Sequence, residues 1–235
     1  MLPGNAIFGA AHLENLLESA RRYLAHTIAL GTPLASAVRL RMHGEIRLKR
    51  WFPFTAEQVI ALDRGMIWNA TVRMYGVPVQ GFDRLIDHVG AMQWKILGII
   101  PLINAAGADI TRSAAGRVIA ESMWLPPVFL RTDKVWKEVG LAHASVCVPI
   151  EGERPELTLA VAATGRVENV AVERWGNPDG TGYRYIPFGG IASREGTFGG
   201  YTMSTQLRVG WYFGTERFKT DGEFFRCTID HAEFR

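Results

Sequence analysis

A row of side chains in the segment 109–125 carries the residue types that general acid–base chemistry needs. Ser113, Arg117 and Glu121 follow one another at spacings i, i+4 and i+8, and Trp124 continues the row at i+11. In an α-helix these spacings place side chains on one face, so Arg117 and Glu121 can pair directly. A carboxylate beside a guanidinium and an indole can transfer a proton, bind an anionic group and stack on a planar molecule.

Two interpretations of this row remain open from the sequence. In the first, Arg117 and Glu121 form a buried ion pair whose only role is to hold the helix in place. In the second, the pair lines a cavity in which Glu121 is the acid or base, Arg117 binds an anionic group and Trp124 forms a wall. Asp83 is a second candidate carboxylate that could work with Glu121. The sequence alone does not show that the two meet.

Further candidate binding residues lie in the second half of the chain and in the same helix. The stretch from Trp175 to Gly180 is rich in turn formers, which suits either a tight loop or the rim of a cavity. The expected substrate-binding residues are Arg112, Trp124, Trp175, Asn177, Tyr185, Arg208 and Trp211.

Metal, nucleotide and nucleophile chemistry find no support in the sequence. The six histidines show none of the short spacings typical of zinc sites, and Cys147 and Cys227 lie in strand-like patterns. The glycine pairs match neither the GxGxxG pattern nor the P-loop. We therefore expect no metal and no cofactor, and any reaction would be cofactor-independent.

The elements that must position these residues follow from hydrophobic periodicity. The spacing predicts helices over 13–30 and 109–125, and alternation predicts a long strand over 38–48. Residues 55–58 are expected to form a short link, and most of the last hundred residues alternate like antiparallel strands. The helix 109–125 has few charges and is apolar on most sides, so we expect it to be buried. This order predicts an α+β fold in one domain, with a large antiparallel sheet and two helices.

Composition limits the classes of protein. Twenty-six basic and 23 acidic residues give a net charge of +3 over 235 residues, without the clustered excess typical of nucleic-acid binders. The apolar stretch 96–110 is interrupted by Pro101, Asn104 and Asp109, so no membrane span is expected. No credible signal peptide is expected either. The chain is therefore expected to be soluble and cytoplasmic, and its oligomeric state stays open.

Several motifs carry a resemblance to a known family. These are MHGEIRL at 42–48, FTAEQ at 54–58, TRSAAGR at 111–117, WGNPDG at 175–180, PFG at 187–189 and GEFFR at 222–226. They resemble an uncharacterised bacterial family catalogued as a domain of unknown function. The family implies no established reaction. Its shape is similar to that of the lipoprotein carriers, which implies a strongly curved antiparallel sheet, or half-barrel, wrapped around helices over an apolar cavity.

These observations lead to one expected function and to alternatives. We expect a cofactor-independent enzyme of the lyase, isomerase or hydrolase type, acting on an apolar or aromatic small molecule between the sheet and the buried helix. Glu121, Arg117 and Asp83 would be the catalytic residues. The alternatives are a non-catalytic binding or carrier protein for a hydrophobic ligand, and a structural or interaction protein with no ligand. An N-terminal helical segment, 1–32, would pack on a main domain, 33–235.

Overall fold

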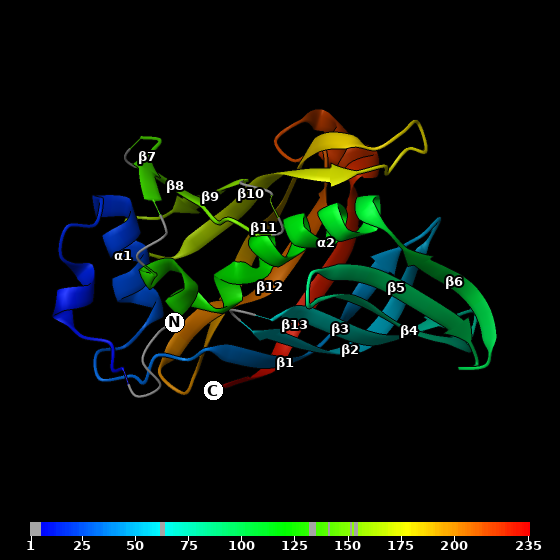
Figure 1. The fold of residues 1–235 in the computed structure, drawn as a ribbon, viewed down its shortest axis with the longest axis horizontal. Helices are drawn as coiled ribbons and strands as arrows, with labels where there is room; N and C mark the ends of the chain where they lie inside the picture. Colours follow the sequence, from blue (N-terminus) through cyan, green and yellow to red (C-terminus); the bar gives the residue numbers. More distant parts are fainter. Residues whose placement is uncertain (1–5, 62–63, 132–134, 141, 151, 153–154) are drawn as a thin grey trace.

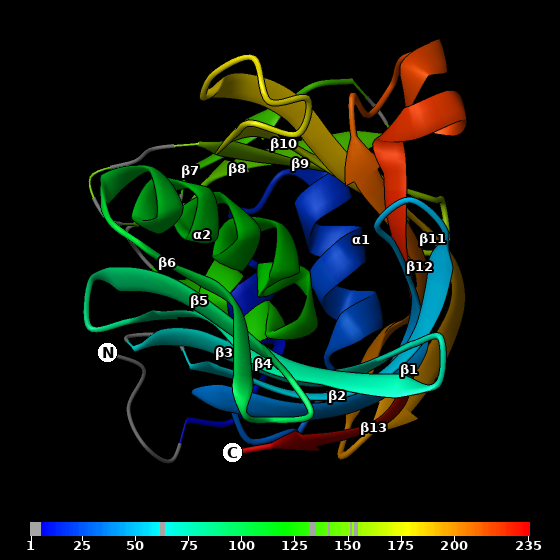
Figure 2. The same ribbon diagram turned by 90° about the vertical axis from the view of Figure 1, so that its right-hand side faces the viewer.

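A computed structural model describes the whole chain except residues 1–5, 62–63, 132–134, 141, 151 and 153–154. Its described residues form one antiparallel sheet of 13 strands that curves around two helices (Figures 1 and 2). The expected fold class, an α+β domain with a large curved antiparallel sheet around a helix, is confirmed. The division at residue 32 stays a prediction, and the first five residues of that segment lie outside the described residues.

The first half of the sheet is a meander in which each strand pairs with the next. Its strands are β1 (Ala37–Arg47), β2 (Trp51–Ala61), β3 (Gly65–Met74), β4 (Val77–Ile86), β5 (Val89–Ile96) and β6 (Ile100–Ala106). Alternation drives these strands because every second side chain faces the core. On β1, for example, Val38, Leu40 and Met42 are buried while Arg39 and Arg41 are exposed.

The second half continues the sheet from its other edge back to the middle. Its strands are β7 (Val135–Glu138), β8 (His143–Cys147), β9 (Glu156–Val161), β10 (Val167–Gly176), β11 (Arg184–Phe198), β12 (Tyr201–Trp211) and β13 (Glu223–Phe234). The C-terminal strand β13 pairs with β1, so β6 and β7 become the two edges. The first and last strands of the chain therefore pair near the centre of the sheet, and the two edge strands come from the middle of the sequence.

Two strands differ from the expectations. Residues 55–58 were expected to form a link, and they lie inside β2 instead. The reason is that Pro53 and the inward-facing Gln58 break the apolar alternation, although Phe52 and Phe54 still face the core. Strand β6 was not expected at all. Its side chains are mostly exposed on both faces, so the segment shows no alternation between buried apolar and exposed polar positions.

The two helices lie on the concave side of the sheet (Figure 2). Helix α1 (Glu18–Thr27) is shorter than the expected 13–30, and helix α2 (Ala108–Glu121) ends four residues before Leu125. Two 3₁₀ turns, Ser122–Trp124 and Pro126–Leu130, follow α2 because Pro126 and Pro127 cannot continue an α-helix. The C-terminal half of α2 is buried, whereas its first turn is exposed.

The core fills the space between the helices and the concave face. Tyr23 and Leu24 of α1 are fully buried, and the Tyr23 hydroxyl donates a hydrogen bond to the carbonyl of Met123 at 3.4 Å. Trp68, Phe54 and neighbouring side chains fill the space below α2. Neither described helix has the length and apolar character that crossing a bilayer requires.

Candidate functional site

Helix α2 lies close to both flanks of the curved sheet because two glycines let the backbones approach. A Cβ at Gly116 would come within 2.7 Å of the Cγ of Arg174 on β10. A Cβ at Gly90 on β5 would come within 2.5 Å of the Cα of Thr111. The helix begins after Gly107, whose φ of 111° suits glycine. Gly107 therefore occupies the N-cap position of α2.

Arg117 stands at the centre of a buried polar cluster under α2. Its Nε donates a hydrogen bond to Glu121 at 2.7 Å, and its Nη1 donates one to Asp83 of β4 at 3.0 Å. The guanidinium carbon lies 4.9 Å from the ring centre of Trp68, a cation–π contact. The structure thus brings Glu121, Arg117 and Asp83 together, with the arginine between the two carboxylates.

The other carboxylate oxygens of the cluster are also hydrogen-bonded. Gln58 Nε2 donates to Glu121 at 2.5 Å, and the indole of Trp94 donates to Asp83 at 3.0 Å. Burial alone lowers the pKa of Arg117, but the charges of Glu121 and Asp83 outweigh this effect and hold the pKa above its ordinary value. The arrangement is therefore an ion-pair network in which each of the four carboxylate oxygens accepts one hydrogen bond.

Two buried polar atoms beside this network have no hydrogen-bond partner in the described part of the chain. They are Gln58 Oε1 and Trp68 Nε1, an acceptor and a donor on neighbouring positions of β2 and β3. A buried polar atom without a partner costs about 1–3 kcal/mol. Because Gln58 and Trp68 both contact the cluster, these atoms mark a place under α2 where a ligand's polar group could bind.

Arg174 on β10 holds the opposite flank of α2 and was not among the expected site residues. Its Nε donates to the carbonyl of Ser113 at 3.0 Å, and its guanidinium carbon lies 4.5 Å from the ring centre of Phe188 and 4.9 Å from that of Trp211. Burial, with the nearby charge of Arg117, lowers the pKa of Arg174 to about 9. Because Arg174 lies in a strand far from α2 in the sequence, no sequence pattern predicts this contact.

Three of the expected binding residues meet at the exposed start of α2. The guanidinium of Arg112 lies 3.8 Å from the ring centre of Trp175 and donates to the hydroxyl of Tyr185 at 2.9 Å. The Trp175 indole donates to Asp109 at 2.8 Å. The cluster therefore fastens the first turns of α2 to β10 and β11.

The remaining expected binding residues do not join one site. Trp124 is buried and donates to the carbonyl of Ser204, while Asn177 accepts a hydrogen bond from the backbone of Gly182 and closes its own loop. Arg208 pairs with the buried Glu223. Trp211 packs on Arg174, as described above. Within the described structure, each of the four has a structural contact that accounts for its position.

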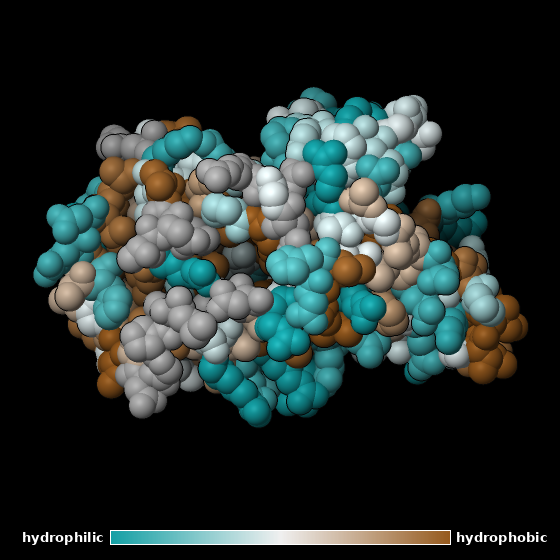
Figure 3. Space-filling model, viewed as in Figure 1, coloured by the Kyte–Doolittle hydropathy of each residue, from teal (hydrophilic) through white to brown (hydrophobic). Residues whose placement is uncertain are grey.

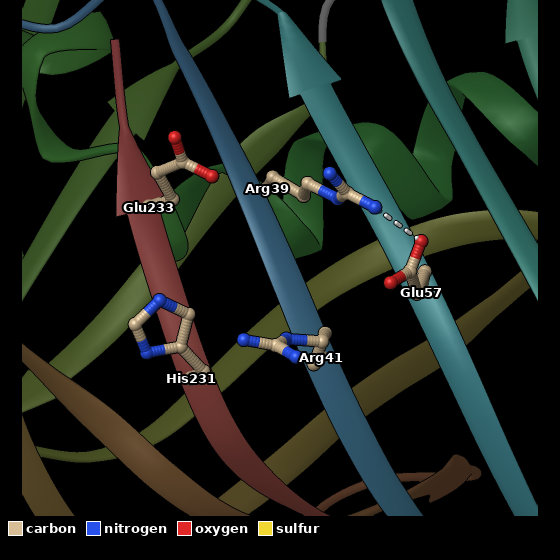
Figure 4. Close-up of a pocket in the computed structure, with 5 residues that line it drawn as sticks. All are labelled: Arg39, Arg41, Glu57, His231 and Glu233. Carbon is tan, nitrogen blue, oxygen red and sulfur yellow. Dashed lines mark hydrogen bonds and ion pairs between the residues drawn. The ribbon is translucent and has the colours of Figure 1, made fainter.

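The convex face of the sheet carries a separate, small polar pocket (Figure 4). It has a volume of about 190 Å³ and is lined by Arg39, Arg41, Glu57, His231 and Glu233. Arg39 donates to Glu57 at 2.7 Å across strands β1 and β2. Both signs of charge line this pocket, and it lies on the solvent side of the sheet, away from the cluster under α2.

The solved structures that the chain resembles include the following two. One is a putative outer membrane lipoprotein-sorting protein domain from Vibrio parahaemolyticus, with a TM-score of 0.46 and 8% identity over 95% of this chain and 93% of that chain. The other is a LolA superfamily protein from Nitrosomonas europaea, with a TM-score of 0.44 and 8% identity over 98% and 94% of the two chains. No curated protein matches the chain.

The expectation of an enzyme is wrong. The geometry gives the physical reason. The groups expected to act as acid, base and anion partner bind one another, with Arg117 forming an ion pair with both Glu121 and Asp83. The sequence could place Glu121 beside Arg117, but it could not show that Gln58 and Trp94 fill the remaining hydrogen-bonding positions.

The sequence motifs that suggested an uncharacterised family are also explained by the comparisons. Residues 14–234 match a family of unknown function, DUF6920. This range includes every strand and both α-helices of the described structure. The chain therefore belongs to the family of unknown function DUF6920.

Proposed function

We propose that this protein binds an apolar ligand on the concave face of the sheet, beneath α2, and does not transform it. The observation that carries this proposal is the way α2 is held. Side-chain polar contacts fasten it to both flanks, through Arg117 to Asp83 on β4 and through Arg174 of β10 to Ser113. Such contacts can break and re-form without disrupting the sheet's own hydrogen bonds.

The surface beneath α2 suits a hydrocarbon with one polar group. There the ring of Trp68 packs edge to face on Phe54 and in a tilted arrangement on Trp94, with ring centres 5.7 Å apart in each pair. Beside them are the unpartnered atoms of Gln58 and Trp68, which can bind a polar head. Because these side chains fill the space when α2 is docked, the ligand enters only when α2 moves away from the sheet. Helix α2 is then the lid of the site.

A disulfide that locks α2 to β10 tests this proposal. The ideal Cβ of Gly116 lies 3.4 Å from the Cβ of Arg174, close to the separation of about 3.5–4.5 Å found in disulfides. The variant Gly116→Cys/Arg174→Cys is made in a background with Cys147→Ser and Cys227→Ser. The probe is a dansylated fatty acid, whose fluorescence rises in an apolar site. We expect the reduced variant to bind the probe and the oxidised variant to bind it at least about tenfold more weakly.

The reduced variant is the matched control because it differs from the oxidised one only by the disulfide. Equal binding by the two forms would show that α2 is not the lid. The absence of probe binding by the wild-type protein would remove the ligand-binding proposal itself. Unchanged mass and unchanged chromatographic retention of the probe after incubation, measured by liquid chromatography with mass spectrometry, separate binding from turnover.

A further inference from the structure

Three hairpin turns meet at one end of the sheet, and we call them the hairpin surface. They are residues 48–50 between β1 and β2, 75–76 between β3 and β4, and 97–99 between β5 and β6. Ring contact between Phe52 and Tyr75 at 5.2 Å joins the first turn to the second. The backbone N–H of Leu97 donates to the carbonyl of Pro78 at 2.9 Å and joins the second turn to the third.

Large apolar side chains project from this surface into solvent. Tyr75 is 76% exposed and Ile99 is 74% exposed. Leu48 and Leu97 in the turns are also exposed, as are four apolar residues of the adjoining strands, Val77, Ile100, Leu102 and Ile103. Figure 3 shows apolar residues gathered at the right-hand end of the molecule, over β5 and β6. A contiguous apolar surface of this kind marks an interaction site rather than part of the core.

The charges of the hairpin surface all have one sign. The basic residues are Lys49 and Arg50 in the first turn, with Arg47, Arg73 and Lys95 on the adjoining strands, and the segments 46–56, 70–82 and 88–108 contain no Asp or Glu. The nearby Asp221 already accepts a hydrogen bond from Arg217 at 3.0 Å. The three segments that carry the turns therefore have an excess of basic charge.

We propose that the hairpin surface docks on an anionic lipid bilayer. The apolar side chains would enter the acyl boundary, and the basic residues would contact the negatively charged headgroups. Lys49 and Arg50 can extend their aliphatic stems along the apolar tips while their charged ends stay at the headgroups. A two-fold contact between copies of this chain is disfavoured, since it would place basic residues against basic residues.

Vesicle co-sedimentation tests the proposal on the full chain. We compare vesicles of equal parts phosphatidylcholine and phosphatidylglycerol with vesicles of phosphatidylcholine alone. The wild-type protein should bind the anionic vesicles, and added salt should weaken binding. Lys49→Gln/Arg50→Gln should lower the affinity about 25-fold, at about fivefold for each basic residue. Leu97→Ser/Ile99→Ser should reduce binding to both kinds of vesicle.

The matched control is Leu30→Ser, because Leu30 is 71% exposed and lies outside the hairpin surface. It should bind vesicles like the wild type. Equal binding by Leu97→Ser/Ile99→Ser and by the wild type would overturn the proposal. A wild-type dimer that this variant converts to a monomer, without vesicle binding, would instead assign the surface to contacts between copies. Binding of the dansylated fatty acid should be unchanged in these variants, so failure here is distinct from failure of the ligand-binding proposal.

Discussion

Arg117 on α2 donates a hydrogen bond to Asp83 on β4 at 3.0 Å, and this contact joins the helix to the first half of the sheet. On the other flank, Arg174 of β10 donates to the carbonyl of Ser113 at 3.0 Å. The two arginines therefore hold α2 between strands that are far apart in the sheet order. A lid held in this way is closed by polar contacts at its sides and by apolar packing below it.

Removing Arg117 should destabilise the fold strongly. Arg117→Leu leaves Asp83 and Glu121 mostly buried without a cation, and losing one partner of such a network costs about 3–5 kcal/mol in the free energy of unfolding. The triple variant Arg117→Leu/Asp83→Asn/Glu121→Gln removes all the charges and should lose less. Urea denaturation measures both values. If the triple variant were as unstable as Arg117→Leu, the loss would come from packing and not from unpaired charge.

Alanine at Gly116 should test how closely α2 and β10 approach. Glycine to alanine in a helix interior usually stabilises by about 1 kcal/mol. Here the new Cβ would lie 2.7 Å from the Cγ of Arg174, so Gly116→Ala should destabilise the protein. In an Arg174→Ala background that Cγ is absent, and the same change should be neutral or stabilising. Thermal unfolding of the four proteins gives the coupling, and additive effects would rule out the close contact.

The strands of this fold were largely predictable because alternation requires only a buried face and a solvent face. The exceptions have local causes. In β2, Gln58 faces inward because it donates to Glu121, so a polar side chain interrupts the apolar positions. In β6, a run of exposed apolar residues hides the period of two. Alternating patterns reflect burial on one face of a strand. They do not predict a strand where a polar residue faces the core, as in β2, or where both faces are exposed, as in β6.

Of the site, only the contact between residues of the same helix was predictable from the sequence. The four-residue spacing predicted the pairing of Arg117 with Glu121, because both lie on one helix face. Asp83 could be named as a candidate but not placed, since its distance from Glu121 depends on the curvature of the sheet. Gln58 and Arg174 come from strands on opposite flanks. No local pattern connects them to α2.

Acid should weaken the contact between Glu223 and its two arginines. Burial raises the pKa of Glu223, but hydrogen bonds from Arg208 and Arg226 outweigh this and hold the pKa below its ordinary value. A carboxylate with a lowered pKa in the folded state stabilises the protein above its unfolded pKa of about 4.3, and this contribution is lost as the pH falls below that value. Urea midpoints measured from about pH 7 to about pH 3 should fall more steeply for the wild type than for Glu223→Gln. Parallel curves would assign the acid sensitivity to other groups.

The thiol of Cys227 should report the opening of α2. Burial raises its pKa to about 12, and the side chain lies in the same core cluster as Trp68 of β3 and Ile119 of α2. Cys147 is only half-buried and serves as the internal reference. In the native protein at about pH 8, iodoacetamide should modify Cys147 faster than Cys227, since the thiolate is the reactive form and burial limits access.

A second variant connects that rate to the lid. Gly90→Ala places a Cβ within 2.5 Å of the Cα of Thr111, which forces the first turns of α2 away from β5. If this weakens the docking of α2 by about 1.4 kcal/mol, Cys227 should react about tenfold faster while the rate at Cys147 stays the same. Peptide mass spectrometry resolves the two sites. Rates that rise together would show global unfolding, and an unchanged rate at Cys227 would show that α2 does not control access to the concave face.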